Sequence, residues 1–370
     1  MRTQFLRQFD WWMGLAVLVL VAFGFAAIYS VALSQSLSEF LSVKKQAIAF
    51  LIGLVALVGF VATNYRVLLS FSPHLYVVGV LLLVGVLFFG DTIRGTTGWF
   101  RIGGFSFQPV EFMKIALVLF LSRQFSLRRG TTLSWREILV TGAIVGLPVF
   151  LVLLQPDLGS AFVLLGTWVI LLLFARVTRR QFLSLLALAV VLLGGLWQFG
   201  LVDYQKARLT SFLDPASDPL GQGYNVTQSV IAVGSGQWFG RGLGFGSQSQ
   251  LRFLPEAHTD FVLAVIAEEL GFVGLLLVFM AFGVLFWRLA VLAMRAQDGF
   301  TVFLVLGVGS ALFLQFVVNA GMNLGLMPVT GITLPFVSYG GSSLIFFLVM
   351  IGIVESASLR LSVFQGHDTW

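Results

Sequence analysis

Residues 299–354 read GFTVFLVLGVGSALFLQFVVNAGMNLGLMPVTGITLPFVSYGGSSLIFFLVMIGIV and contain no Asp, Glu, Lys or Arg. A membrane-spanning helix needs about 20 apolar residues, so this stretch is too long for one helix. Pro328 and Pro335 divide it, because proline ends or kinks a helix. The stretch therefore predicts two membrane-spanning helices joined by a segment rich in Gly, Pro and hydroxyl groups.

Similar apolar runs recur along the whole chain. Its 370 residues are 58% hydrophobic and 10% charged, whereas a soluble domain carries about 25% charged residues. We expect one all-α, polytopic membrane domain that covers residues 1–370, with about ten transmembrane helices. The predicted spans are 11–31, 46–63, 73–90, 109–122, 138–154, 159–175, 182–201, 262–287, 301–325 and 342–359.

The distribution of Lys and Arg predicts the orientation, because these residues gather on the cytoplasmic side of membrane proteins. With a cytoplasmic N-terminus, 13 of them fall inside and 8 outside. The inner set is Arg2, Arg7, Arg66, Arg123, Arg128, Arg129, Arg136, Arg176, Arg179, Arg180, Arg288, Arg295 and Arg360, and the outer set is Lys44, Lys45, Arg94, Arg101, Lys206, Arg208, Arg241 and Arg252. Both termini are therefore predicted to be cytoplasmic, with a long extracytoplasmic loop, 202–261, between helices 7 and 8.

Two aspects of composition exclude classes of function. The net charge of +6 is accounted for by this topology, so we expect no nucleic-acid partner. The chain has no cysteine, which excludes disulfides, cysteine-ligated metals and a cysteine nucleophile.

Charged side chains inside a membrane are costly and are candidates for function. Glu111 and Lys114 lie at positions i and i+3 of the fourth span, within reach of each other. They form either a structural ion pair or part of a polar cavity. Glu268 and Glu269, about two turns into the eighth span, either bond to neighbouring segments or face a cavity.

The end of the long loop concentrates polar chemistry just before the eighth span. Glu256, His258 and Asp260 fall within five residues. Asp260 is either a helix N-cap, where Asp is favoured, or a general base or metal ligand at the boundary between water and lipid. The spacing is no specific metal signature, so the metal is unknown.

The Gly-rich run 234–246 in the same loop resembles a phosphate-binding loop only superficially, because no buried strand precedes it. We expect a flexible segment whose backbone can approach a ligand. The basic residues of this loop, Lys206, Arg208, Arg241 and Arg252, are suited either to pyrophosphate groups or to lipid headgroups. Segment 319–343 is expected to line a cavity, since non-helical backbone at membrane depth survives only inside protein or beside water.

Several of these stretches resemble the shape, elongation, division and sporulation (SEDS) family of bacterial cell-wall polymerases, the RodA and FtsW type. The strongest matches are LPEAHTDFVLAVIAEELG (254–271) and GLMPVTGITLPFVSYGGSS (325–343), with QPDLGS (155–160), GQGYNVTQSVIAVGSG (221–236) and QPVEFMK (108–114) in the same order as in the family. The chain departs from the family pattern at Val110 and Thr97, and its short termini look most like RodA.

The resemblance implies a peptidoglycan glycosyltransferase that polymerises lipid II, the undecaprenyl-pyrophosphate-linked disaccharide-pentapeptide, on the outer face of the bacterial cytoplasmic membrane. Elongation is the favoured role, and a class B penicillin-binding protein is the implied partner. The alternatives are a lipid II flippase and a division-specific FtsW-type polymerase. The sequence implies no definite cofactor, and it leaves open whether the reaction uses a divalent cation, Mg²⁺ or Mn²⁺.

The resemblance also implies roles for single residues. The family's essential acid corresponds to Asp260, and its ion pair corresponds to Glu111 and Lys114. The remaining residues expected at the substrate site or cavity are Arg208, Glu256, His258, Ser338 and Tyr339.

Overall fold

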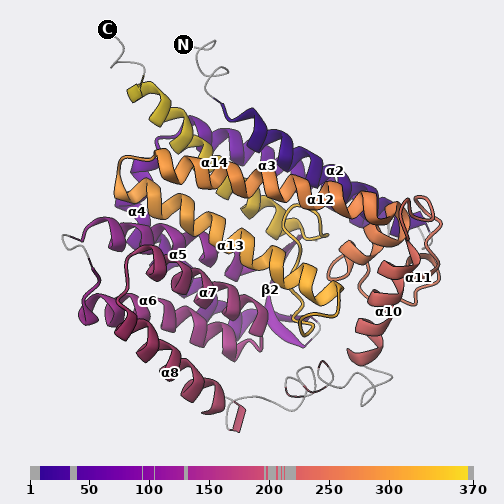
Figure 1. The fold of residues 1–370 in the computed structure, drawn as a ribbon, viewed down its shortest axis with the longest axis horizontal. Helices are drawn as coiled ribbons and strands as arrows, with labels where there is room; N and C mark the ends of the chain where they lie inside the picture. Colours follow the sequence, from indigo (N-terminus) through magenta and orange to yellow (C-terminus); the bar gives the residue numbers. More distant parts are fainter. Residues whose placement is uncertain are drawn as a thin grey trace.

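The structure is a computed structural model of a helical bundle, in which the start of the first described helix and the end of the last lie at the same end (Figure 1). The helices that overlap the ten predicted spans are α2 (Trp11–Leu33), α3 (Phe40–Ala62), α4 (Tyr65–Phe89), α5 (Pro109–Ser126), α6 (Trp135–Leu154), α7 (Leu158–Phe174), α8 (Arg179–Gly195), α12 (Val262–Arg295), α13 (Gly299–Asn323) and α14 (Gly341–Gln365). The described residues are 9–33, 40–93, 95–103, 105–128, 132–195, 197–198, 206, 210, 212 and 222–365.

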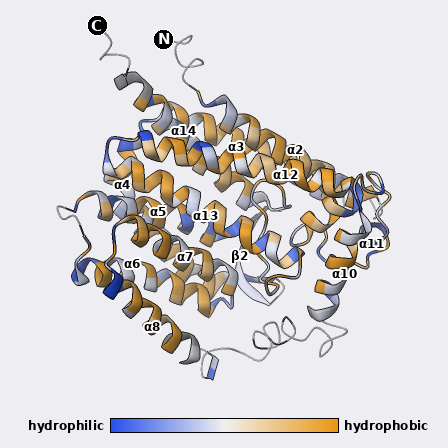
Figure 2. Ribbon diagram, viewed as in Figure 1, coloured by the Kyte–Doolittle hydropathy of each residue, from blue (hydrophilic) through white to orange (hydrophobic). Residues whose placement is uncertain are grey.

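Among the described helices, seven are long and apolar enough to cross a membrane: α2, α3, α4, α6, α12, α13 and α14. Figure 2 shows the same apolar character along most of the bundle. The prediction of a helical, polytopic membrane protein is confirmed. The number of ten crossings stays a prediction, because α7 and α8 have only 17 residues each and α5 carries an acidic and two basic residues.

Helix α5 lies in the middle of the bundle, where it packs against α4 and α13 and also contacts α6, α7 and α14. Two apolar clusters meet on it. Val118 and Leu119 belong to the cluster shared with α2, α12 and α14, and Leu117 and Leu121 belong to the cluster shared with α6 and α7. A helix surrounded by protein in this way can carry charges that lipid would not tolerate.

A small antiparallel sheet, which the apolar pattern does not predict, precedes α5. Its strands are β1 (Asp91–Ile93), β2 (Thr96–Ile102) and β3 (Phe105–Phe107), in the order β1-β2-β3. Thr, Phe and Trp favour strands, and positive φ angles at Gly95 (82°) and Gly103 (55°) fall in the two turns, where glycine is the least strained residue. Strand β2 packs against α4 and α5, so the sheet closes over the start of α5.

Helix α12 is interrupted at Gly271, whose φ of 68° and ψ of −165° are not helical. The Gly-rich run fills the break. The amide of Phe272 donates to the carbonyl of Gln237 (2.8 Å), and the amide of Arg241 donates to the carbonyl of Glu268 (3.0 Å). The backbone groups that the break would leave unpaired are thereby satisfied.

Glycine is required in this run for close approach. A Cβ at Gly236 would lie 1.8 Å from the carbonyl oxygen of Ala267, and one at Gly240 would lie 2.1 Å from that of Glu269. At these two glycines the run therefore approaches α12; approach of the run to a ligand stays a prediction. Within the described part of the loop 202–261, residues 222–261 include the helices α10 (Gln222–Ser235) and α11 (Ser247–Gln250).

The adjacent carboxylates of α12 have bonding roles. Both are buried, with exposed fractions of 0% for Glu268 and 1% for Glu269. Glu268 accepts hydrogen bonds from the amides of Gln248 (2.8 Å) and Ser249 (3.1 Å) at α11. Glu269 accepts one from the hydroxyl of Ser30 on α2 (2.6 Å). The pair thus ties α12 to α11 and to α2.

The predicted orientation is testable with Thr92 and Thr132, which are exposed and flank opposite ends of α5. Because the protein has no native cysteine, Thr92→Cys and Thr132→Cys each introduce a single thiol. We expect a membrane-impermeant maleimide to label Thr92→Cys in intact cells, and to label Thr132→Cys only after the membrane is opened. Labelling of Thr132→Cys but not Thr92→Cys in intact cells would show that the orientation is the reverse of the predicted one.

Candidate active site

A cavity of about 220 Å³ lies beside the start of α14, at the end of the bundle away from the end of that helix. The cavity is formed by the starts of α5, α7 and α14, by α3 and α13, by the sheet and by the turn that precedes α12. Its lining residues are Lys45, Trp99, Phe105, Ser106, Gln108, Glu111, Lys114, Asp157, Ser160, Thr259, Asp260, Gln315, Gly331, Ile332, Thr333, Tyr339, Gly340, Gly341 and Ser343. Segment 319–343 thus contributes to a cavity wall, as its composition predicts.

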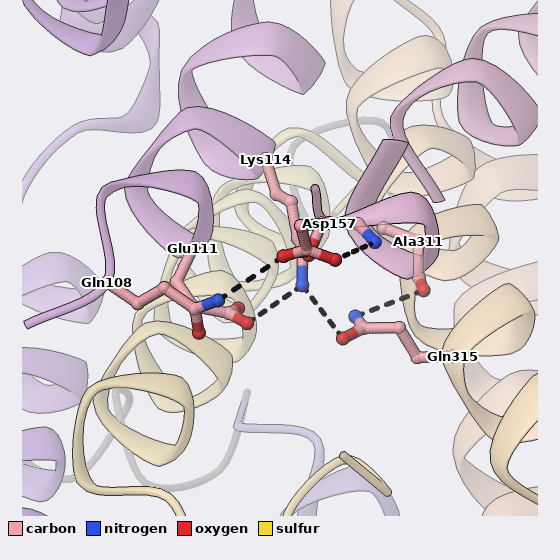
Figure 3. A network of polar contacts seen from close by, with 7 residues as sticks. Gln108, Glu111, Lys114, Asp157, Ala311 and Gln315 are labelled. Atoms are coloured by element: carbon pink, nitrogen blue, oxygen red, sulfur yellow. Dashed lines mark hydrogen bonds and ion pairs between the residues drawn. The ribbon is translucent and has the colours of Figure 1, made fainter. Parts of the chain in front are cut away.

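Glu111 and Lys114 form an ion pair in the cavity wall, with 2.9 Å between Lys114 Nζ and Glu111 Oε1. Nζ also donates to Oε1 of Gln315 on α13, at 2.9 Å (Figure 3). Both residues are 3% exposed, and among the described residues Glu111 Oε2 has no hydrogen-bond partner. Both interpretations of this pair, a structural ion pair and part of a polar cavity, therefore apply. The pair joins α5 to α13 through Gln315 and also lines the cavity.

Asp157 is a second carboxylate of the cavity and caps α7. Its Oδ1 accepts from the amide of Ser160 (2.9 Å), and its Oδ2 accepts from the Ser160 hydroxyl (2.7 Å). Gln108 Nε2 donates to the same Oδ2 at 3.5 Å (Figure 3). The turn between α6 and α7 is thereby fastened to the start of α5.

Asp260 is half-buried and lines the cavity. The N-cap position of α12 is occupied by Phe261, which makes no side-chain cap hydrogen bond, so Asp260 lies one residue before the cap. A Cβ on Gly331 would lie 3.7 Å from Asp260 Oδ2. The carboxylate therefore faces the 330–333 part of the cavity wall.

Two asparagines of α13 fix the backbone of Asp260. Its carbonyl accepts from Nδ2 of Asn319 (3.0 Å) and from Nδ2 of Asn323 (2.9 Å). Asn319 Nδ2 also donates to the carbonyl of Ile332 (2.8 Å). These amides hold the turn before α12 and segment 330–333 together, and sequence reasoning missed their role; buried Asn on an apolar helix is the signal that marks them.

The remaining predicted residues differ in their distance from the cavity. Tyr339 lines it, and its amide donates to the carbonyl of His258 (2.8 Å) while the two rings pack edge to face. Ser338 is buried and does not line the cavity; its hydroxyl donates to the carbonyl of Thr259 (2.6 Å). His258 and Ser338 thus join the 336–340 turn to the segment that carries Asp260.

Glu256 also does not line the cavity; its backbone stabilises the turn that precedes α12. Its φ is 53°, and its carbonyl accepts from the amides of Thr259 and Asp260 (3.1 Å each). Arg208 lies outside the described residues. Arg241 and Arg252 do not line the cavity, so the cavity gives no support to a role for them in binding pyrophosphate.

Lys45 of α3 is a cavity residue that sequence reasoning missed. The adjacent Gln46 places it: Nε2 donates to the carbonyl of Ser338 (3.2 Å), and Oε1 accepts from the amide of Gly340 (3.1 Å). Lys45 is exposed, and the sequence carries no signal that separates it from an ordinary lysine near the end of a span.

The lining therefore combines two ammonium groups, Lys45 and Lys114, with the carboxylates of Glu111, Asp157 and Asp260. Ammonium groups bind anionic phosphates, and a carboxylate in a partly buried site can accept a proton from a hydroxyl. Within the described part of the chain, no three His, Asp or Glu side chains are grouped to hold a metal ion. The arrangement suits transfer of a group from a phosphate leaving group to a hydroxyl.

Comparison with known proteins adds independent information. The family described as FTSW_RODA_SPOVE, cell cycle protein, matches residues 10–362. The chain is 38% identical to "Stage V sporulation protein E" of Bacillus subtilis over 86% of this chain and 87% of that protein. It is 41% identical to "Peptidoglycan glycosyltransferase MrdB" of Escherichia coli K12 over 82% of both. It is 36% identical to "Probable peptidoglycan glycosyltransferase FtsW" of Trichlorobacter lovleyi over 98% and 97%.

Two solved structures have the same fold. One is described as "Structural coordination of polymerization and crosslinking by a peptidoglycan synthase complex"; its TM-score is 0.79 at 34% identity, over 95% of this chain and 98% of that one. The other is the rod shape determining protein RodA of Thermus thermophilus, with a TM-score of 0.70 at 30% identity over 95% and 96%.

Proposed function

We propose a function from one premise: the chain belongs to the FtsW, RodA and SpoVE family of cell cycle proteins. The protein is a multi-pass peptidoglycan glycosyltransferase of the bacterial cytoplasmic membrane, and it polymerises lipid II at the outer face. The observation that carries this proposal is the position of Asp260 in a cavity that also contains Lys45 and Lys114. Relatives named peptidoglycan glycosyltransferases support the reaction class.

The cavity residues suit the chemistry of this transfer. A sugar hydroxyl of the acceptor attacks C1 of the donor sugar, and the bond between C1 and the pyrophosphate oxygen breaks. Asp260 accepts the proton of the attacking hydroxyl. Lys45 and Lys114 stabilise the negative charge that develops on the undecaprenyl pyrophosphate leaving group. A divalent cation beside the pyrophosphate would supply the same stabilisation, with Asp260 as a candidate ligand.

Role and partner belong to the same proposal. Elongation of a rod-shaped cell is supported by the 41% identity to MrdB and by the RodA structure, and the FtsW relatives keep division as the alternative. A class B penicillin-binding protein is the proposed partner, because the SEDS resemblance implies one. Depletion of the protein is expected to produce round cells; filaments with blocked septa would assign it to division.

The cationic role of Lys45 gives a prediction with a matched control. Lys45→Gln is expected to slow polymerisation by about 10- to 150-fold, the effect of losing one charge-assisted hydrogen bond of about 1.5–3 kcal/mol, and Lys45→Arg to retain most activity. Lys44 is also exposed but does not line the cavity, so Lys44→Gln is expected to be nearly normal. Equal rates for the two Gln variants would remove Lys45 from the mechanism.

The experiment that tests the proposal uses purified protein and lipid II in detergent, with and without the penicillin-binding protein. A polymerase forms glycan strands under these conditions, whereas a flippase has no two sides between which to act. We expect strands of many disaccharides. Unchanged lipid II in detergent, together with transfer of lipid II across vesicle membranes, would establish the flippase instead.

A further inference from the structure

A second cavity, of about 450 Å³, lies at the end of the bundle opposite the candidate active site, between the end of α5 and the start of α6. Its lining is amphiphilic. Its apolar lining residues are Phe125, Leu133 and Val140. Its polar or charged lining residues are Gln124, Arg128, Ser134, Arg136, Glu137 and Thr141. Neither part belongs to the polymerase chemistry.

The connection between α5 and α6, which lines this cavity, makes two hydrogen bonds, one to the segment that joins α7 to α8 and one to the start of α8. Arg128 Nη1 donates to the carbonyl of Ala175, and Gln181 Nε2 donates to the carbonyl of Leu133 at 2.8 Å. The first contact uses one of the five N–H donors of the guanidinium. The connection between α5 and α6 is thereby attached to the connection between α7 and α8.

The second of these connections is itself basic. Arg176, Arg179 and Arg180 are exposed, and Figure 2 shows the start of α8 as a strongly hydrophilic patch next to apolar helix surface. Glu137, the carboxylate in the cavity lining, is already engaged: its Oε2 accepts from the amide (2.7 Å) and the hydroxyl (2.8 Å) of Ser134. The cavity lining and the neighbouring α7–α8 connection together carry a net positive charge.

The surroundings of the cavity are suited to a lipid rather than to a free ion. Val140 is 46% exposed, and the neighbouring Leu139 and Leu127 are 70% and 63% exposed. An anion bound by Arg128 and Arg136 can therefore extend its apolar part along the exposed apolar side chains of α6. Basic pockets between helices at a membrane surface bind phosphorylated lipid headgroups.

We propose that this cavity binds the phosphodiester headgroup of an anionic phospholipid, with Arg128 and Arg136 as its cationic contacts. The lipid contacts the connection between α5 and α6 and the start of α6, and the hydrogen bond of Arg128 to Ala175 links this connection to the end of α7. This site is independent of the polymerase reaction, and its ligand would be retained by a catalytically inactive protein.

The test uses the full-length purified protein, stripped of lipid, and native mass spectrometry with added phosphatidylglycerol, phosphatidylcholine or inorganic phosphate. We expect one tightly held phosphatidylglycerol. Arg136→Gln leaves the hydrogen bond from Arg128 to Ala175 in place and should weaken the binding of phosphatidylglycerol about five-fold. The double variant Arg128→Gln/Arg136→Gln should weaken this binding about 25-fold. The matched control is Arg66→Gln/Arg295→Gln, which removes the same charge from the same end of the bundle outside the lining.

Three outcomes would overturn the proposal. They are equal weakening in the control, equal retention of phosphatidylcholine, and occupancy by inorganic phosphate without a preference for the anionic lipid. Thermal unfolding of Arg136→Gln at the wild-type temperature shows that its loss of lipid is local. A protein that holds phosphatidylglycerol through Arg136 and is stabilised by it supports the proposal even if polymerase activity is absent.

Discussion

Asp260→Asn is expected to leave the protein folded and to reduce polymerisation of lipid II by about 10²–10⁴-fold, the contribution typical of a general base. Asn has nearly the size of Asp but lacks the charge and the basicity. The contacts from Asn319 and Asn323 reach the backbone carbonyl of residue 260, so they survive the substitution. The measurement is the rate of strand formation by the purified variant, together with its melting temperature.

Comparison variants separate catalysis from support of the turn. Glu256→Gln and His258→Ala are expected to lose less activity, because neither side chain lines the cavity. Rescue of Asp260→Asn by added Mg²⁺ or Mn²⁺ would show that Asp260 holds a cation rather than a proton. Turnover by Asp260→Asn close to the wild-type rate would contradict the assignment of the active site.

The Glu111 and Lys114 pair gives the second large expected effect. Glu111→Ala or Lys114→Ala alone should destabilise the protein by about 3–5 kcal/mol, because each leaves a buried charge without its partner. The Lys114 variant also removes the contact of Nζ with Gln315. The double variant Glu111→Leu/Lys114→Met should recover much of the melting temperature, since an apolar pair of similar volume replaces both charges.

Activity of this double variant distinguishes a cavity role from a purely structural one. Because both side chains line the cavity, we expect it to fold and to remain inactive. Full recovery of strand formation would show that the pair only joins α5 to α13.

The helices were predictable because the hydrocarbon core of a membrane imposes one requirement, about 20 apolar residues for each crossing. Each predicted span overlaps one helix, and Pro328 and Pro335 fall between the end of α13 and the start of α14. The sheet at 91–107 was not predictable in this way. Two of its strands have only 3 residues each, too short for a periodic signal, and the 7-residue strand β2 packs against α4 and α5.

The Gly-rich run shows a second limit of local patterns. Its glycines are consistent with several close approaches, to a ligand or to protein, and the sequence does not contain the partner. The structure supplies it in the break of α12 at Gly271. The same applies to Glu268 and Glu269, whose partners at Ser30 and 247–250 are distant in sequence.

The candidate site was predictable where it contains charged side chains, because burying a charge within a membrane protein is costly. Buried charges such as Glu111 and Lys114, and Asp260 beside a span, are conspicuous against an apolar background. Lys45 was not, because a lysine near the end of a span is ordinary at a membrane surface. Its relation to the cavity arises only from the contacts of Gln46 with the 338–340 turn.

The central claim is that lipid-linked sugar reacts in the cavity between α3, α5, α13 and segment 330–343. The most direct test is photocrosslinking with a lipid II analogue that carries the reactive group beside its pyrophosphate, followed by peptide mapping. We predict labelling of the peptides that contain Lys45 and Lys114, suppressed by unlabelled lipid II and retained in Asp260→Asn. Labelling confined to lipid-facing surfaces such as α8, without competition by lipid II, would contradict the claim.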